Sequence, residues 1–516
     1  MQEIDCDIID PEVLLINPPS SKGTSGRGDF FTPPMGLAYM ASYLEENDIK
    51  VDIIDCDPEQ IFLDYFSPSS FQKNKLSKKL NQYDSPVVVG IGPLTTPFLK
   101  NGLAIAKFLK KHFPTSYLVV GGPHPSIDSP KMAKRMLNDF EYIDAVCINE
   151  GEKTLYELVG KLNKGDFIEE LEGLVLRSNN GYTYKKRKLF NNQDLDSLPF
   201  PSRNILQKYS NRYKLALRRN FVQILSDKGL LKKYGKNPKF TVIFSSRGCP
   251  FKCTFCCSLK VRRVRSAENV VKEIEFCLNE YNIHCFVFYD DLFTTSSPVE
   301  VKRVITICNL ILQNNLDVYW EVELRADIIC NLGESVLSLM NKAGCCTVNI
   351  GIEKATDAAL EWINKGLNVT QIREAINILR KAGDFVINGT FLLGGEFEKK
   401  EDILNLIKFS KEIGLDYSAY YPLEIHPGTL VYSKAKDNGL IDDILDPYML
   451  NSNQYPLYLN SDLTEHDLYE FQCTAYKHFY FDPDYIDHLI NKVGSVSIIY
   501  EQYKHLFQHA FIQKTR

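Results

Sequence analysis

Short apolar runs alternate with helical patterns over the first 165 residues. The pattern predicts strands at residues 12–19, 50–57, 85–93, 116–126 and 144–152, and helices at 36–47, 99–113 and 153–165. Strands this apolar, separated by helices, are typical of a parallel sheet covered on both faces. We therefore expect residues 1–165 to form a doubly wound α/β domain that binds its ligand beyond the carboxyl ends of the strands.

A second alternating block covers residues 238–435. It predicts strands at residues 239–245, 285–291, 318–324, 347–353, 385–395 and 416–424, with helices that begin near Ser266, Ser297, Gly333, Thr370 and Lys399. Ser297 followed by Pro298 is a good N-cap with proline at the first helical position. A closed βα barrel needs eight repeats, so we expect a partial (βα)6 barrel with its active site at the carboxyl ends of the strands.

The remaining segments are less regular. Residues 166–237 are interpreted as a linker region with a hairpin at 171–190, which turns at Asn180–Gly181, and a basic helical segment. The stretch 208–239 holds ten Lys or Arg against one acid, either as a solvated face or as a contact for an anionic substrate or the neighbouring domain. Residues 436–516 are predicted to form a helical, aromatic substrate or capping region, whose aromatics mainly pack a core.

Composition restricts the class of protein. The 516 residues are 44% hydrophobic and 24% charged, with a formal net charge of −5, which argues against a general nucleic-acid binder. The 14 cysteines are scattered through a long chain, unlike a secreted disulfide scaffold. The N-terminus lacks a secretory signal, and no apolar run is long enough to span a membrane. We expect a reduced, cytoplasmic, soluble protein.

Four cysteines lie in the stretch "SSRGCPFKCTFCCSLK", residues 245–260, directly after the first strand of the second block. Cys249, Cys253 and Cys256 form C-x3-C-x2-C, and thiolates suit zinc or iron–sulfur clusters. A structural zinc normally needs a second pair of ligands, which is absent downstream, and adjacent Cys256 and Cys257 would strain a tetrahedral shell. Three thiolates on a four-iron cluster would leave one iron open for a small molecule. An alternative ligand set replaces Cys256 with Cys257.

The chain resembles the cobalamin-dependent branch of the radical S-adenosylmethionine (radical SAM) superfamily. The resemblance rests on "SSRGCPFKCTFCC", "FVFYDDLF", "NIGIEKATDAALEWINKGLNVTQIREAINILRKAG" and "HPGTLVY", and on N-terminal blocks such as "LLINPP", "VVGGPHPS" and "INEGEKTLYELV". It covers residues 12–435, apart from about 205–238, and implies a Rossmann-like cobalamin-binding domain followed by a radical SAM core.

The resemblance implies roles for residues at the barrel mouth. Cys249, Cys253 and Cys256 would bind a 4Fe–4S cluster, whose open iron chelates SAM. The polar parts of SAM would be held by Asp291 (or Asp290), Arg325 and Glu353, and Phe255 would lie along its adenine. Alternatively, the two aspartates cap a helix, and Arg325 pairs with Glu353.

It also implies cobalamin contacts at the carboxyl ends of the N-terminal strands. These contacts are Asn17, Thr95, Thr96, Gly121, Gly122, His124, Glu150 and Gly151. The cobalamin motif D-x-H-x-x-G is absent, so we expect cobalamin to bind base-off, without a histidine on its lower face. His124 follows the fourth strand and is interpreted as a loop or capping histidine.

Three functions follow. The first is methylation of an unactivated carbon of a small molecule, in which reduction of the cluster cleaves SAM to a 5′-deoxyadenosyl radical. A reductase such as flavodoxin or ferredoxin would supply the electron. The second uses the same cofactors for a radical cyclisation or rearrangement without methyl transfer. The third is a non-catalytic cobalamin- or zinc-binding protein.

Overall fold

The computed structural model describes residues 9–19, 32–63, 65, 68–210, 212–213, 239–439 and 463–487. These ranges divide into two compact units: residues 9–19 and 32–213 form the first, and residues 239–439 and 463–487 form the second. Most of the basic segment predicted at 208–239 and part of the aromatic C-terminal region lie outside the described residues.

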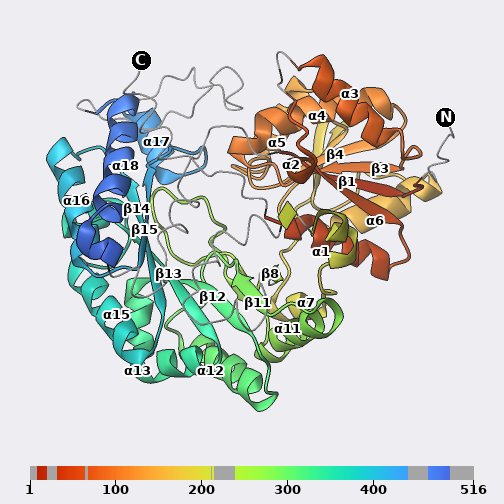
Figure 1. Ribbon diagram of the computed structural model, residues 1–516. Helices are drawn as coiled ribbons and strands as arrows, with labels where there is room; N and C mark the ends of the chain where they lie inside the picture. Colours follow the sequence, from red (N-terminus) through yellow and green to blue (C-terminus); the bar gives the residue numbers. More distant parts are fainter. Residues whose placement is uncertain are drawn as a thin grey trace, which may run out of the picture. The chain divides into compact units, whose positions relative to one another are not determined.

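The first unit contains a seven-stranded sheet (Figure 1) with the order β2-β1-β3-β4-β5-β6-β7. Its first five strands are parallel, and the last two are antiparallel to their neighbours. The strands are β1 (Val13–Asn17), β2 (Val51–Asp55), β3 (Val88–Ile91), β4 (Tyr117–Gly121), β5 (Ala145–Cys147), β6 (Leu174–Ser178) and β7 (Gly181–Tyr184). The order reverses between β1 and β3, where open α/β sheets bind ligands.

Helices cover both faces of this sheet, as the continuous apolar strands predict. On one face, Leu14 and Ile16 of β1 belong to a core with α3 (Ser70–Leu80), α4 (Leu99–His112) and α5 (Lys131–Asp139). On the other, Val13 and Leu15 pack with α1 (Met35–Glu46) and α6 (Glu152–Lys164). Of these helices, only α3 and α5 were not predicted, because their exposed faces carry many charged or polar residues. The doubly wound arrangement is confirmed.

The predicted hairpin lies within this sheet rather than in a separate linker. Ser178 pairs with Gly181, so the two-residue turn is Asn179–Asn180, one position before the predicted Asn180–Gly181 turn. Beyond it lie α7 (Asn192–Ser197), α8 (Arg203–Leu206) and the 3-10 turn η2 (Gln207–Tyr209). Tyr209 and Tyr213 are buried against the α1 side of the sheet, so the compact unit continues past residue 165.

The second unit contains a six-stranded parallel sheet in the order β15-β14-β13-β12-β11-β8. Its strands are β8 (Phe240–Ile243), β11 (Cys285–Phe288), β12 (Tyr319–Leu324), β13 (Cys345–Glu353), β14 (Val386–Leu393) and β15 (Tyr417–Pro422). All six predicted strands are present, and consecutive strands are neighbours. This open (βα)6 sheet confirms the predicted partial barrel.

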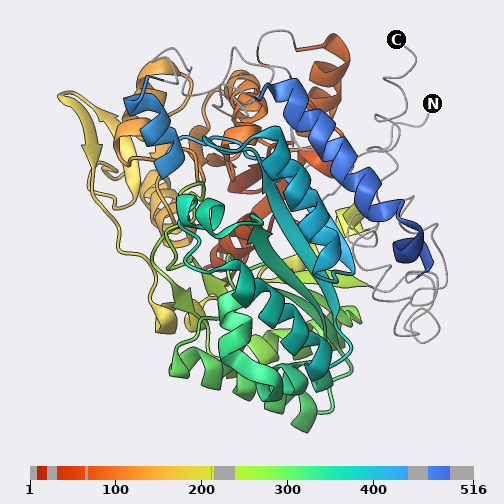
Figure 2. The same cartoon turned by 90° about the vertical axis from the view of Figure 1, so that its left-hand side faces the viewer.

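Helices line the outer face of this sheet (Figures 1 and 2). They are α11 (Ala267–Tyr281), α12 (Pro298–Gln313), α13 (Ala326–Lys342), α15 (Val369–Ala382) and α16 (Lys400–Glu412). Two shorter helices, α14 (Asp357–Trp362) and α17 (Leu430–Asp437), follow the carboxyl ends of β13 and β15. Ser297 caps α12 as predicted. α13 begins before the predicted Gly333, which interrupts it with φ +69°.

The helix α18 (Glu465–Tyr480) covers the free edge of the open sheet (Figure 1). The Tyr480 hydroxyl donates to the carbonyl of Ser418, and the Tyr476 hydroxyl accepts the N–H of Tyr420. Gln472 Nε2 donates to the carbonyl of Tyr420. Three side chains spaced one helical turn apart therefore satisfy the unpaired edge of β15. Within the described ranges, no helix is long and apolar enough to cross a membrane.

Candidate active site

The four-cysteine stretch lies on a loop between β8 and α11, at the carboxyl end of the second sheet. Two short strands, β9 (Ser246–Arg247) and β10 (Arg263–Val264), pair antiparallel and close the base of the loop. Gly248 has φ +79°, and a Cβ there would lie 2.3 Å from the Val261 carbonyl oxygen. Only glycine fits this position, so closing the loop requires the glycine that lies directly before Cys249.

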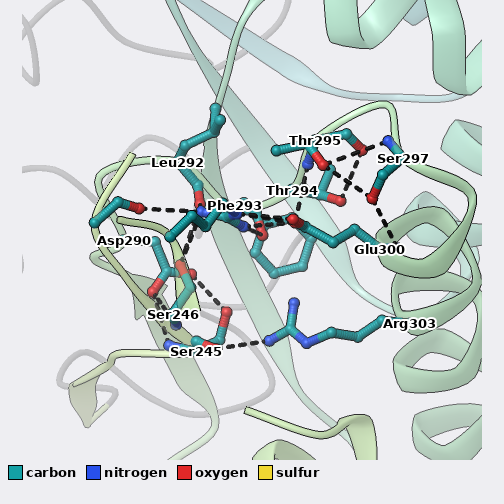
Figure 3. Close-up of polar contacts among 12 residues, drawn as sticks. Ser245, Ser246, Asp290, Leu292, Phe293, Thr294, Thr295, Ser297, Glu300 and Arg303 are labelled. Atoms are coloured by element: carbon teal, nitrogen blue, oxygen red, sulfur yellow. Dashed lines mark hydrogen bonds and ion pairs between the residues drawn. The ribbon is translucent and has the colours of Figure 1, made fainter. Parts of the chain in front are cut away.

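Buried charged groups hold both ends of the cysteine loop (Figure 3). Asp290 accepts hydrogen bonds from the N–H groups of Ser245 (2.7 Å) and Ser246 (2.8 Å) and from the Ser245 hydroxyl. Burial raises the pKa of Asp290 to about 6, despite these donors and the nearby Arg303. Asp290 thus anchors the strand end; it neither faces solvent nor caps a helix.

Arg262 holds the other end of the loop. It forms a two-pronged ion pair with Glu300 of α12, at 2.8 and 3.0 Å, and donates to the carbonyl oxygens of Leu292 and Phe293. Beside it, Arg303 donates to the carbonyl of Ser245 at 2.9 Å. This network, drawn in part in Figure 3, fixes the backbone before and after the cysteines.

Each of the three predicted ligand cysteines receives an N–H donor at its sulfur. The N–H of Phe251 bonds to Cys249, the N–H of Ser258 lies 3.4 Å from Cys256 Sγ, and Arg325 Nη1 lies 3.9 Å from Cys253 Sγ. Burial nevertheless raises the pKa of Cys249. Such donors stabilise thiolates, the form that binds iron.

Cys257 differs from these three cysteines. The residue as a whole is exposed but its thiol is partly buried, and this burial, followed by the nearby Cys256, raises the pKa of the thiol. The backbone hydrogen bond at its sulfur comes from its own residue. Within the described ranges, no three Cys, His, Asp or Glu side chains lie close enough to bind one metal ion. The thiolates of an iron–sulfur cluster bind different irons, so they need not meet at one point.

The residues predicted to hold SAM occupy different environments. Arg325 is buried and pairs with Asp327 at 2.9 Å, and Glu353 is buried and pairs with Lys365 at 2.9 Å. The proposed Arg325–Glu353 pair is therefore wrong, although the Lys365 carbonyl accepts a hydrogen bond from Arg325 and so connects the two pairs. Phe255 is half-buried against the core, and Asp291 is exposed.

A polar row inside the second sheet was not predicted. Glu321 is buried, and burial, with the nearby Glu323, raises its pKa to about 8. Asn349 bonds to Glu321 and accepts a hydrogen bond from Asn388 at 3.0 Å. The signal was available in "YWEVEL", because Glu321 and Glu323 alternate with apolar Trp320, Val322 and Leu324, which pack against the helices.

Several predicted cobalamin residues lie at the switch point of the first sheet, where they bind one another. Asn17, at the end of β1, donates to Asp55 at 2.8 Å. His124 is fully buried, and its Nδ1 lies 3.0 Å from the Thr96 hydroxyl. The N–H of His124 also bonds to Leu94, so His124 ties the β4 loop to the β3 loop. This contact agrees with its interpretation as a loop histidine.

The other predicted cobalamin residues have local roles. Gly122 has φ +130°, and a Cβ there would lie 2.3 Å from the Leu94 nitrogen. Gly121 lies beside Cys147, Gly151 precedes α6, and Glu150 accepts the N–H of Phe190 at 2.8 Å. Thr95 differs, because its hydroxyl is buried and bonds to no group within the described residues. It is a polar atom that a ligand at the switch point could use.

Comparisons with known proteins identify both units. A model of the radical SAM superfamily matches residues 243–409, and a model of the B12 binding domain matches residues 26–159. The chain is 32% identical over 448 residues to the uncharacterized methyltransferase PH0819 of Pyrococcus horikoshii, covering 83% of this chain and 84% of that protein. The chain belongs to the cobalamin-dependent radical SAM family.

Other known proteins resemble this chain in sequence or in fold. The chain is 26% identical to the anaerobic magnesium-protoporphyrin IX monomethyl ester cyclase of Rubrivivax gelatinosus, over 78% of this chain and 65% of that protein. The fold matches the methyltransferase TsrM of Kitasatospora setae (TM-score 0.63, 16% identity, 83% of this chain and 74% of that chain). It also matches the radical enzyme OxsB (TM-score 0.66, 18% identity, 98% and 71%).

Family membership defines the cofactors of this enzyme. Radical SAM proteins use a 4Fe–4S cluster and SAM, and the B12 domain adds cobalamin. The donor set of the cysteine loop fits a cluster, because three thiols on one anchored loop each carry an N–H donor. The third predicted function, a non-catalytic binding protein, is therefore set aside.

Proposed function

We propose that this chain cleaves SAM reductively to a 5′-deoxyadenosyl radical and methylates an unactivated carbon of a small molecule. The observation that carries the proposal is the cysteine loop. Cys249, Cys253 and Cys256 each have an N–H donor at sulfur, and buried charges anchor both ends of their loop at the carboxyl end of the sheet. In this proposal these thiolates hold the cluster, while cobalamin supplies the methyl group when bound.

Residues around the loop would hold SAM. Phe255 and Asp291 are open enough to reach a ligand, whereas Glu353 is fixed by Lys365 with φ +68°. A non-glycine residue held at positive φ beside a buried ion pair is a feature of functional sites. Glu353 would therefore present an oriented carboxylate to the ribose hydroxyls or the ammonium group of SAM.

The first unit would bind cobalamin at its switch point. Thr95 supports this placement, because its buried hydroxyl is available next to the end of β3. Asn17, Thr96, Gly121, Gly122, Glu150 and Gly151 surround the same carboxyl edge. His124 is held by Thr96 and Leu94, which supports base-off binding without a histidine ligand on cobalt.

Methylation is preferred over cyclisation because of the similarity to methyltransferases. The chain aligns with PH0819 and, at 24% identity over 86% of its length, with the cytidylyl-2-hydroxyethylphosphonate methyltransferase of Streptomyces wedmorensis. Cyclisation without methyl transfer stays the second candidate because of the likeness to the cyclase. A flavodoxin or ferredoxin would supply the electron. A cytoplasmic location fits the described cysteines, all of which are free thiols.

Methyl-labelled SAM separates the two candidates. The protein is reconstituted anaerobically with iron, sulfide and cobalamin, and candidate small molecules are screened for 5′-deoxyadenosine formation. We expect label in the product in step with deoxyadenosine. Deoxyadenosine with an unlabelled, rearranged product would show that cyclisation is correct, and absence of iron and sulfide binding would refute both candidates.

A further inference from the structure

Arg325 is held rigidly at the end of β12. Its Nε donates to Asp327 at 2.9 Å, and its Nη2 donates to the Lys365 carbonyl and lies 3.3 Å from the second Asp327 oxygen. The residue is only 5% exposed. Because a guanidinium is planar, fixing two of its nitrogens also fixes the direction of the third, Nη1.

The fixed nitrogen points at a predicted cluster ligand. Nη1 lies 3.9 Å from Cys253 Sγ, and the guanidinium carbon lies 3.7 Å from the ring centroid of Phe251 on the same loop. The flat face of the guanidinium stacks on Phe251, and its edge, at Nη1, contacts the sulfur of Cys253. Arg325 therefore contacts the cysteine loop at two points.

The segment that orients Arg325 also binds the cysteine loop. The N–H of Thr254 donates to the Ile363 carbonyl at 2.9 Å, and Asn364 Nδ2 donates to the Lys252 carbonyl at 2.8 Å. Lys365, the next residue, accepts the hydrogen bond from Arg325. Hydrogen bonds to the backbone of both neighbours of Cys253 thus place it against Arg325.

We propose that Arg325 is a positioning residue that tunes the cluster through Cys253 and does not bind the SAM carboxylate. This inference rests on the proposed function, because it needs a cluster on these cysteines. An N–H donor and a nearby positive group stabilise the more negative, reduced cluster, so Arg325 raises the cluster's reduction potential. Arg325 engages Asp327, Lys365 and Cys253, so SAM would have to displace an existing partner.

The test compares Arg325→Met and Arg325→Lys with a matched control, Arg373→Met. Arg373 also lies over an aromatic ring, Phe409 at 4.9 Å, and near a carboxylate, Glu412 at 3.4 Å, but far along the chain from the cysteines. Each full-length protein is reconstituted, its iron and sulfide are measured, and the cluster is titrated by EPR without SAM or substrate. SAM binding is measured separately.

We expect Arg325→Met to retain iron but to lower the ratio of reduced to oxidised cluster about tenfold at a fixed potential, ~59 mV for one electron. Arg325→Lys should fall between, and Arg373→Met should match the wild type. Affinity for SAM should change less than twofold, by about 0.4 kcal/mol or less. An unchanged potential, with or without weaker SAM binding, overturns the inference.

Two further outcomes keep the inference separate from the proposed function. If the wild type binds no iron or sulfide, the proposed function fails first. If neither Arg325 variant retains a cluster, pulsed EPR of reduced wild-type protein carrying ¹⁵N-arginine decides. A ¹⁵N coupling to the cluster supports the Arg325 contact, and its absence overturns it.

Discussion

The cysteine loop of the second unit and the carboxyl edge of the first sheet use their predicted residues in opposite ways. On the loop, surrounding groups direct N–H donors toward the thiols of Cys249, Cys253 and Cys256. At the sheet edge, most of the predicted side chains bind protein groups instead, as His124 does with Thr96 and Asn17 with Asp55, and only the Thr95 hydroxyl bonds to no described group.

The difference follows from what each cofactor needs. A metal cluster depends on a few side-chain bonds, so its ligands must be available and their direction must be fixed by other residues. Cobalamin is a large organic cofactor, and a site for it can rely on shape and backbone contacts. Polar residues at its edge can therefore hold the loops together, and glycines such as Gly122 can serve the packing of those loops.

We expect the largest effect from replacing single cysteines of the loop, which tests which of them bind the cluster. Cys256→Ser should lose nearly all bound iron and sulfide, because it removes a thiolate that receives a backbone donor. Cys257→Ser should keep the cluster, because Cys257 is exposed and receives no hydrogen bond from any other described residue. Iron and sulfide analysis with an absorption spectrum measures both. The reverse result would assign the ligand set Cys249, Cys253 and Cys257.

We expect a smaller effect from removing the buried carboxyl of Asp290, which tests whether this group anchors the cysteine loop. Asp290→Ala leaves the N–H groups of Ser245 and Ser246 without their acceptor, so we expect a loss of about 3 kcal/mol of unfolding free energy. Both tryptophans, Trp320 and Trp362, lie in the second unit, so their fluorescence during urea denaturation reports this unit.

The control for this change is its neighbour. Asp291→Ala removes an exposed carboxyl and should shift the denaturation midpoint little. Equal losses for the two variants would contradict the anchoring role of Asp290. Comparing the two variants also settles a question that the sequence leaves open, because two adjacent aspartates after one strand do not indicate which of them is buried.

The sequence alone predicted the parts of each region that depend on local pattern. Apolar runs located the strands of both sheets, and the spacing of Cys249, Cys253 and Cys256 located the loop. Partners distant in sequence could not be predicted. Arg325 is an example. Its partner Asp327 is only two residues away, but the Lys365 carbonyl accepts its hydrogen bond only because the loop after α14 folds against the cysteine loop.

The same limit explains the sheet edge. Asp55 lies within the strand predicted at residues 50–57, yet it accepts hydrogen bonds from Asn17 and, 158 residues away, from the Tyr213 hydroxyl at 2.6 Å. No local pattern indicates that Tyr213 returns to β2. Charged and polar residues satisfied by distant parts of the chain are therefore where structure adds most to the sequence.

The smallest expected effect concerns Asp55 and its dependence on pH. Burial raises the pKa of Asp55 to about 7 and outweighs the hydrogen bonds from Tyr213, Asn17 and Asp57, which act in the opposite direction. The folded chain thus holds this proton more tightly than the unfolded chain. The resulting stabilisation is fully present below about pH 4, is lost by at most about 1.4 kcal/mol per pH unit as pH rises from there to about 7, and changes little above that.

Hydrogen exchange of peptides from β1 and β2, corrected for the intrinsic pH dependence of exchange, measures this slope. Wild-type protection should fall from pH 5 to pH 7 and level off above that, and Asp55→Asn should remove most of the slope because the group no longer titrates. Asp52→Asn, which removes a carboxyl that binds Tyr83 and Lys208 from the same strand, is the control and should keep it. A slope that persists in Asp55→Asn would show that other groups cause it and that Asp55 does not titrate in this range, as expected if the three donors outweigh burial. In that case the sheet edge would hold a charged carboxylate by directed donors, as the cysteine loop holds its thiolates, and the contrast between the two regions would disappear.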